Sequence, residues 1–218
     1  MGHTVICISS QDGAGAQETA HLVASAMKFR LIDEEIVARA AVEAGVDREV
    51  VADVEQRKSS LVRLIEGLGT AGMGAGYVVT PPELAGHGQP ASDELRGLIR
   101  SVIEDTASTG SAVIVSHAAS LALAERDDVL RVLVTASPQT RERRLRDTLG
   151  VDAKRAAQAV KRSDAGRADY IKRFYGVSAE LPTHYDVVIN TDKLAPAHAA
   201  RLIVHAAGGR ASADQSIA

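Results

Sequence analysis

The hydrophobic residues of this chain gather into short, nearly continuous apolar runs instead of alternating with polar ones. Four runs are strong, at residues 4–8, 112–115, 129–135 and 186–189, and a weaker one lies at 29–32. Continuous valine, isoleucine and leucine are typical of strands buried on both faces of a parallel sheet. The pattern therefore predicts these runs as strands of such a sheet.

Polar residues, proline and glycine mark helices between the predicted strands. Ser92 is a candidate N-cap, and the residues after it place an apolar face at helical spacing, made of Leu95, Leu98, Ile99, Val102 and Ile103. A second helix is predicted from Ser137 as N-cap, with Pro138 in its first turn, to a stop at Gly150. Strands that alternate with helices along the chain indicate an α/β domain.

The length of 218 residues favours one domain, which we expect to cover residues 1–207. Residues 33–89 break the alternation, because they offer helical patterns and then a stretch rich in glycine and proline without a convincing strand. We expect this segment to be a mobile insert at the ligand edge of the sheet. Residues 208–218 lack apolar content and are predicted to form a disordered tail.

Composition and charge exclude several classes of protein. A formal net charge of -3 argues against general attraction to nucleic acids or membranes, and no apolar run approaches the roughly 20 residues that span a bilayer. The first residues lack the basic region of a signal peptide. The single cysteine, Cys7, fits a core position in a reducing compartment. We therefore expect a soluble cytoplasmic protein.

A glycine loop follows the first predicted strand. Gly13 and Gly15 would let backbone amides turn inward, and the next helix would aim its N-terminus at an anion. In the phosphate-loop pattern G-x-x-x-x-G-K-[ST], only the second glycine is matched, and the other positions hold Ser10, Ala16 and Gln17. These residues alone leave open a phosphate-binding loop or a plain turn from strand to helix.

A basic tract covers residues 141–173, with 11 lysines and arginines against 5 acids, while the remainder of the chain has 14 against 23. This asymmetry favours a polyanion site. Asp164 and Arg167 are three apart and would share one helix face, where a guanidinium could bind phosphate and a carboxylate could accept hydrogen bonds. A solvated charged helix is the alternative. A nucleic-acid groove is disfavoured, because aromatic residues make up only 3% of the chain.

Ser116 and His117 follow the predicted strand at 112–115, at the sheet edge where ligands of open α/β sheets bind. His117 would be able to contact a phosphate there, and a purely structural loop histidine fits equally well. The other histidines show no spacing typical of metal ligands or a catalytic triad, so the sequence predicts no metal site in the protein itself.

Over roughly residues 4–194, six segments in order resemble the cytidylate kinase-like family, a branch of the P-loop nucleoside monophosphate kinases. The loop "CISSQDGAGAQETA" resembles the family's "SREYGSGGREIA" at Gly13, Gly15 and Glu18, and "RSDAGRADYIKRFYG" matches its D-x-x-R-x-x-Y block. The other similar segments are "FRLIDEEIVARAA", "SAVIVSHAAS", "VLRVLVTASPQTRERRL" and "YDVVINTDKL".

The resemblance implies a three-layer P-loop NTPase fold with a five-stranded parallel sheet. It also implies a helical monophosphate-binding insert at about 33–89 and a short arginine-bearing lid at about 141–167. The activity it implies is transfer of the ATP γ-phosphate to CMP or dCMP with Mg²⁺, by positioning and electrostatic stabilisation. The implied partner is a nucleoside monophosphate or another small phosphorylated ligand.

The resemblance also implies roles for individual residues. The donor phosphates would lie on the loop formed by Gly13, Ala14, Gly15, Ala16, Gln17, Glu18 and Thr19. The transferring charge would be neutralised by Arg143 or Arg144, and Arg167 would be a further catalytic residue. The acceptor would be held by Asp33, His117, Asp164 and Arg167.

Two positions depart from the family pattern. Gln17 stands where the family has an arginine, and Ser116-His117-Ala118 replaces its Gly-Arg-Gly. Loss of one preorganised donor typically costs about 100- to 1000-fold in rate. The alternative function is therefore a catalytically impaired, kinase-like protein that binds a nucleotide or phosphorylated ligand as a sensor or partner.

Overall fold

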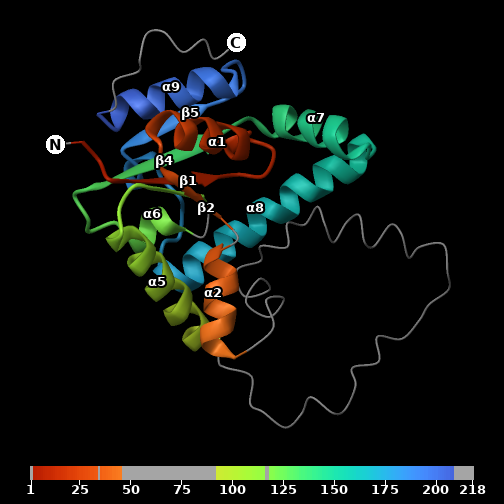
Figure 1. The fold of residues 1–218 in the computed structure, drawn as a ribbon. Helices are drawn as coiled ribbons and strands as arrows, with labels where there is room; N and C mark the ends of the chain where they lie inside the picture. Colours follow the sequence, from red (N-terminus) through yellow and green to blue (C-terminus); the bar gives the residue numbers. More distant parts are fainter. Residues whose placement is uncertain (1, 34, 46–91, 116–117, 209–218) are drawn as a thin grey trace, which may run out of the picture.

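The computed structural model describes residues 2–33, 35–45, 92–115 and 118–208. Its centre is one sheet in which five strands run parallel, in the order β2-β3-β1-β4-β5 (Figure 1). The strands are β1 (Val5–Ser10), β2 (Arg30–Ile32), β3 (Ala112–Val115), β4 (Val129–Thr135) and β5 (Val187–Asn190). All five predicted strands are confirmed, with shifts of one or two residues at three of them.

The order of the strands places the end of β1 at the centre of one edge. Val5 of β1 pairs with Ala112 of β3 on one side and with Val129 of β4 on the other. Earlier strands extend from β1 in one direction and later strands in the other, so the topology reverses there. In open α/β sheets, ligands bind beside the carboxyl ends of the strands at such a reversal.

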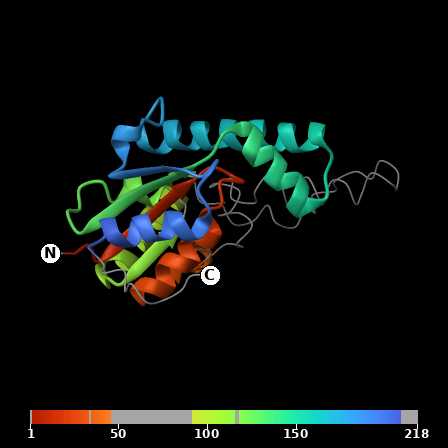
Figure 2. The same ribbon diagram turned by 90° about the horizontal axis from the view of Figure 1, so that it is seen from above.

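Helices cover both faces of the sheet and produce three layers (Figures 1 and 2). One face is covered by α1 (Ala16–Met27) and α9 (Pro196–Ala206), and the other by α2 (Glu35–Ala44), α5 (Ser92–Ser108) and α6 (Ala119–Ala122). The remaining helices are α7 (Pro138–Leu149) and α8 (Ala153–Tyr175), followed by a short 3₁₀ helix at Pro182–His184. The predicted three-layer α/β architecture is confirmed.

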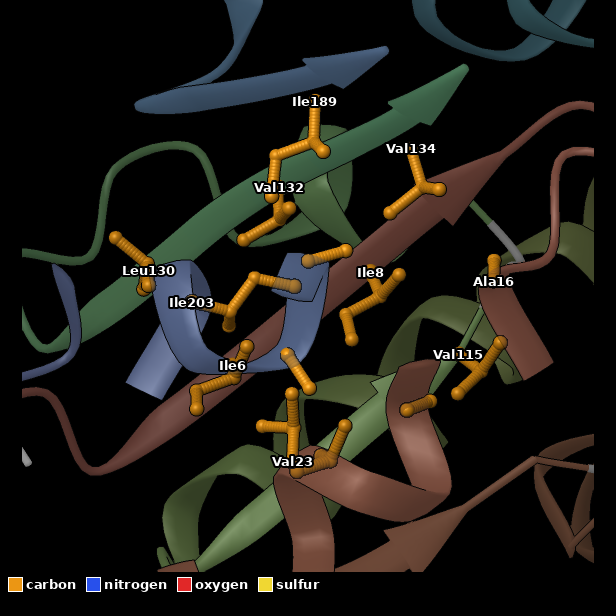
Figure 3. Packing of buried hydrophobic residues seen from close by; sticks show 14 of the residues in the cluster. Ile6, Ile8, Ala16, Val23, Val115, Leu130, Val132, Val134, Ile189 and Ile203 are labelled. Carbon is orange, nitrogen blue, oxygen red and sulfur yellow. The ribbon is translucent and has the colours of Figure 1, made fainter. Parts of the chain in front are cut away.

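Alternation along β1 divides the core between these two faces. Ile6 and Ile8 pack toward α1 and α9 (Figure 3), while Val5 and Cys7 pack toward α2 and α5. Successive side chains of a strand point to opposite faces, so an uninterrupted apolar run fills both layers of core. Cys7 is fully buried, and burial raises the pKa of its thiol to about 12, which makes it a core residue and not a reactive one.

The residues that predicted the two ends of α7 cap the helix as expected. The Ser137 side chain accepts a hydrogen bond from the Thr140 amide, Pro138 opens the helix, and Gly150 closes it in the left-handed conformation at φ 65°. In α8, Asp152 accepts from the Arg155 amide and Gly176 closes the helix at φ 68°. The basic tract thus becomes two capped helices joined by residues 150–152.

Two predicted regions, the insert and the tail, lie mostly outside the described residues. Of the insert at 33–89, the structure describes Asp33, α2 and Gly45, and of the tail it describes only Gly208. The range predicted as a lid, 141–167, consists of most of α7 and more than half of α8. Its action as a lid over a nucleotide stays a prediction. Among the described residues, no helix has the length and apolar character needed to cross a membrane.

We expect Ile8→Ala to lower the free energy of unfolding by about 2–5 kcal/mol, because it opens a cavity in the central strand. Ile8 is 1% exposed, whereas Val188 on the edge strand β5 is 41% exposed. Val188→Ala is the matched control and should change the free energy by no more than about 0.5 kcal/mol. Urea denaturation measures both, and equal effects of the two substitutions would contradict this account of the core.

Candidate functional site

The glycine loop joins the end of β1 directly to the start of α1. Gly13 and Gly15 have φ of 81° and 82°, in the left-handed region that favours glycine, and the Ala14 amide closes the turn on the Gln11 carbonyl at 3.0 Å. Gly15 is the N-cap of α1, and no side chain caps it. The first-turn amides of a helix have no intrahelical partner and carry its partial positive charge, so this loop can accept an anion.

Gly13 is required here by space as well as by conformation. A Cβ atom at this position would lie 3.1 Å from both the Cβ and the carbonyl oxygen of Arg141 and 3.2 Å from its Cα. The loop therefore packs directly on the backbone of α7. Any side chain at residue 13 would push the loop and this helix apart.

Arg141 ties the loop to both helices of the basic tract. Its side chain is 1% exposed, and its Nε donates to the Asp12 carbonyl at 2.7 Å. Its Nη1 and Nη2 atoms donate to the two Asp164 oxygens at 3.0 and 2.7 Å. A second link joins the Ser163 hydroxyl to the Asp12 carboxylate at 2.8 Å. The loop, α7 and α8 are thus held together by a buried, paired guanidinium.

Arg144 brings a second guanidinium to the loop, one helical turn further along α7. Its Nη1 donates to the Gly13 carbonyl at 3.1 Å and to the Thr191 hydroxyl at 3.0 Å, and its Nη2 donates to the Thr191 carbonyl at 2.6 Å. The Thr191 hydroxyl in turn donates to the Ala14 carbonyl at 2.7 Å. A Cβ on Gly15 would lie 3.8 Å from Nη1 of Arg144. A fixed positive charge therefore stands beside a loop that lacks its own lysine.

The first turn of α1 faces the end of β2. The exposed Gln17 amide donates to the carboxylate of Asp33, which follows β2. Thr19 is buried, and its hydroxyl donates back to the Gly15 carbonyl at 2.9 Å. Ala16 is buried and Glu18 is exposed. The positions of the expected lysine and arginine thus hold a buried methyl group and a neutral amide.

On α8, Arg167 is paired with a carboxylate from the segment that follows the helix. Its Nε and Nη2 donate to the two Glu180 oxygens at 2.9 and 2.5 Å, and both side chains are 19% exposed. The Tyr185 hydroxyl donates to the same carboxylate. Burial opposes the charge of Glu180, but hydrogen bonds and the charge of Arg167 hold its pKa below the ordinary value. Burial, with the Glu180 charge beside it, raises the pKa of Tyr185 to about 12.

A cavity of about 190 Å³ lies between α8 and the segment that follows it. Its polar wall is formed by Gln11, Asp164, Arg167, Ser178 and Glu180, and its apolar wall by Ala168, Ile171, Val177 and Ala179. Gln11 directly precedes the glycine loop, and Asp164 is joined to that loop through Arg141. The cavity and the loop therefore share a wall.

Comparison with known proteins identifies the group to which these features belong. A model of the cytidylate kinase-like family matches residues 5–193. The chain belongs to the cytidylate kinase-like family. The predicted resemblance is confirmed, and the protein is nucleotide kinase-like. No curated protein matches the chain in sequence.

Solved structures agree with this fold. An uncharacterized protein from Eubacterium ventriosum matches with a TM-score of 0.64 and 17% identity, over 95% of this chain and 100% of its own. The protein TT1252 from Thermus thermophilus matches with a TM-score of 0.50 and 15% identity, over 95% and 98%. A shikimate kinase from Bacteroides thetaiotaomicron reaches a TM-score of 0.49 and 14% identity, over 93% and 97%. At these identities the first two matches concern the fold alone.

The structure brings many of the predicted site residues of this family member together. Residues 13–19 form the loop and the start of α1, with Arg144 and Asp33 in contact with them. Asp164 and Arg167 share a face of α8 and line the cavity. Arg143 is exposed and makes no ion pair within the part of the chain that the structure describes. His117 lies outside the described residues, so its predicted role stays a prediction.

The sequence patterns did not single out several residues that the structure places in the site, among them Arg141, Glu180, Tyr185 and Thr191. Arg141 was counted in the basic tract, but nothing in a run of arginines shows which of them is buried. Thr191 follows the last strand at the ligand edge, and this position was a usable signal. Glu180 follows α8 without any motif. Tyr185 opens the similar segment "YDVVINTDKL", but nothing in that segment shows its partner, and only folding brings both residues to Arg167.

We expect Gly13→Ala to destabilise the protein more than Gly150→Ala. Both glycines have positive φ, so each substitution costs roughly 1–2 kcal/mol of left-handed backbone strain. Nothing lies within 4 Å of a Cβ at Gly150, whereas residue 13 meets Arg141 and should lose about 1–3 kcal/mol more through overpacking. Urea denaturation compares the two, and an equal loss would show that the contact with α7 is looser than the structure describes.

Proposed function

We propose that the protein is a nucleoside monophosphate kinase that transfers the ATP γ-phosphate to CMP or dCMP. The observation that carries this proposal is the open N-terminus of α1 behind the Gly13–Gly15 loop, with the Arg144 guanidinium fixed against it. The proposed acceptor is a small phosphorylated ligand and not a nucleic acid. The proposed location is the reducing cytoplasm, which suits the single buried Cys7.

The donor phosphates would bind the amides of the loop and of the first turn of α1. Arg144 is held by three hydrogen bonds to Gly13 and Thr191, so its charge is in place before ATP arrives. Preorganised charge of this kind stabilises a transition state without reorganisation during the reaction. An oxygen of the acceptor phosphate would attack the γ-phosphorus while the bond to the ADP oxygen breaks, and no side-chain nucleophile is needed.

Mg²⁺ would accompany the donor phosphates, because this ion is usually held by phosphate oxygens and water with one or two carboxylates. Asp33 fits that chemistry, since its carboxylate lies against Gln17 in the first turn of α1. Bound Mg²⁺ would neutralise charge on the β- and γ-phosphates.

The acceptor would occupy the cavity beside α8, with its phosphate on Arg167. A guanidinium can bind two phosphate oxygens with parallel hydrogen bonds. The carboxylate of Asp164 accepts two hydrogen bonds from Arg141, which gives this residue a positioning role between the acceptor cavity and the loop.

A non-catalytic nucleotide-binding protein is the second candidate, and Gln17 is the observation that favours it. Its neutral amide is hydrogen-bonded to Asp33 where the family has an arginine. The site would still bind phosphate through the loop amides and the fixed Arg144. Without the arginine that the family has at position 17, it would accelerate phosphate transfer little.

A coupled assay of ADP formation separates the two candidates. With ATP and Mg²⁺ we expect turnover that depends on the acceptor and is highest with CMP or dCMP in a panel that includes UMP, AMP and GMP. Reactions without an acceptor give the background rate of ATP hydrolysis. Clear ATP binding with no turnover above that background for any acceptor would refute the kinase and favour the second candidate.

Arg167→Ala should weaken binding of the monophosphate by about 1.5–3 kcal/mol, the contribution of a hydrogen bond to a charged group. Isothermal titration with CMP measures this change. Arg173→Ala is the matched control, because Arg173 lies on the same helix and pairs with Asp169 at the surface. An unchanged affinity of the Arg167 variant would remove this residue from the acceptor site.

A further inference from the structure

Glu180 occupies one edge of the Arg167 guanidinium, and a bound phosphate would use this same edge. Glu180 accepts from Nε and Nη2, two adjacent donors of the fork, at 2.9 and 2.5 Å. Two oxygens of a phosphate use the same kind of paired donors in bidentate recognition. Both Glu180 and Arg167 line the cavity, so the pair lies where an acceptor would enter.

We propose that Glu180 sets the affinity of this cavity for phosphate, because it is an internal anion that a phosphate monoester must displace from Arg167. The identity of the acceptor rests on the proposed function, while the exchange of anions on Arg167 does not. Glu180 is thus an affinity-determining residue of the acceptor site and is distinct from the residues that hold the donor.

A phosphate that uses the Nε–Nη2 edge of Arg167 has to displace Glu180, because one edge of a guanidinium holds one bidentate anion. A phosphate placed beside the bound Glu180 carboxylate would meet a like charge in a partly buried site, where repulsion is stronger than in water. The cavity of about 190 Å³ is several times the roughly 30 Å³ that a water molecule occupies in the liquid. It therefore has room for a phosphate group once the carboxylate has moved.

Glu180 is the partner that can leave. Arg167 lies in the middle of the 23-residue helix α8, whereas Glu180 lies on the short segment between Gly176 and the 3₁₀ helix. Its neighbours Ala179 and Leu181 are exposed, so this segment can shift without opening the core. Tyr185 is 7% exposed and would stay in place, with its hydroxyl then free to donate to the phosphate.

Titration with inorganic phosphate tests the exchange without any need for turnover. We expect Glu180→Gln to bind phosphate about 10-fold more tightly than the natural protein, the factor expected when a charged competitor for one hydrogen-bonding group is removed. Asp169→Asn removes the same charge from an exposed pair on α8 and should change the affinity less than about 2-fold. The double variant Glu180→Gln, Arg167→Ala should lose the gain, which locates it on Arg167 and not on the glycine loop.

An affinity of folded Glu180→Gln equal to that of the natural protein would overturn the proposal and leave the pair as a structural tie. A gain that persists without Arg167 would overturn it as well. Circular dichroism checks folding, because Glu180→Gln leaves Arg167 without its partner. If that variant does not fold, Glu180→Asp tests the proposal instead. The shorter side chain keeps the charge but cannot reach both donors of Arg167. This variant must then bind phosphate more tightly than the natural protein, and an equal or weaker affinity refutes the exchange.

The phosphate titration and the assay of ADP formation test different claims. Tighter phosphate binding by Glu180→Gln together with no ADP formation would refute the kinase and retain the anion exchange. Turnover with CMP together with unchanged phosphate binding would retain the kinase and refute the role of Glu180.

Discussion

The buried guanidinium of Arg141 is the constraint on which the arrangement of the site depends. A charge that is 1% exposed is tolerated only with a counter-charge and hydrogen bonds, and Asp164 and the Asp12 carbonyl supply them. These contacts fix the glycine loop, α7 and α8 against one another. They also bring the backbone of α7 so close to Gly13 that no side chain fits there.

The same rigid contact explains how a loop without its own lysine keeps a positive charge. Once α7 is held by Arg141, the next turn of the helix carries Arg144 to the Gly13 carbonyl and to Thr191. The charge then comes from a neighbouring helix and is fixed by hydrogen bonds, whereas a lysine of the loop would reach its ligand on a flexible side chain. Electrostatic stabilisation of a bound phosphate depends on such fixed charges.

Around the cavity beside α8, the arginines are paired with carboxylates. The basic tract has an excess of cations, yet two of its buried or partly buried arginines are neutralised, Arg141 by Asp164 and Arg167 by Glu180. The charges at this cavity are therefore already balanced, and on our proposal an anion that binds Arg167 there replaces a carboxylate. Exposed cations such as Arg143 remain on the surface of α7, where salt screens their charge.

The sequence by itself determined the strands, the caps of α7 and the place of the loop, because these features depend on local patterns. Continuous apolar runs fill both faces of a sheet, and Ser137, Pro138 and Gly150 act within one turn of themselves. The loop and the D-x-x-R-x-x-Y block also indicated the family. Only the tertiary structure decided how the charges pair: Asp164 lies three residues from Arg167 in sequence, yet it pairs with Arg141 on another helix. Such pairing depends on distance and burial in the folded chain, and neither is encoded in the order of charges along it.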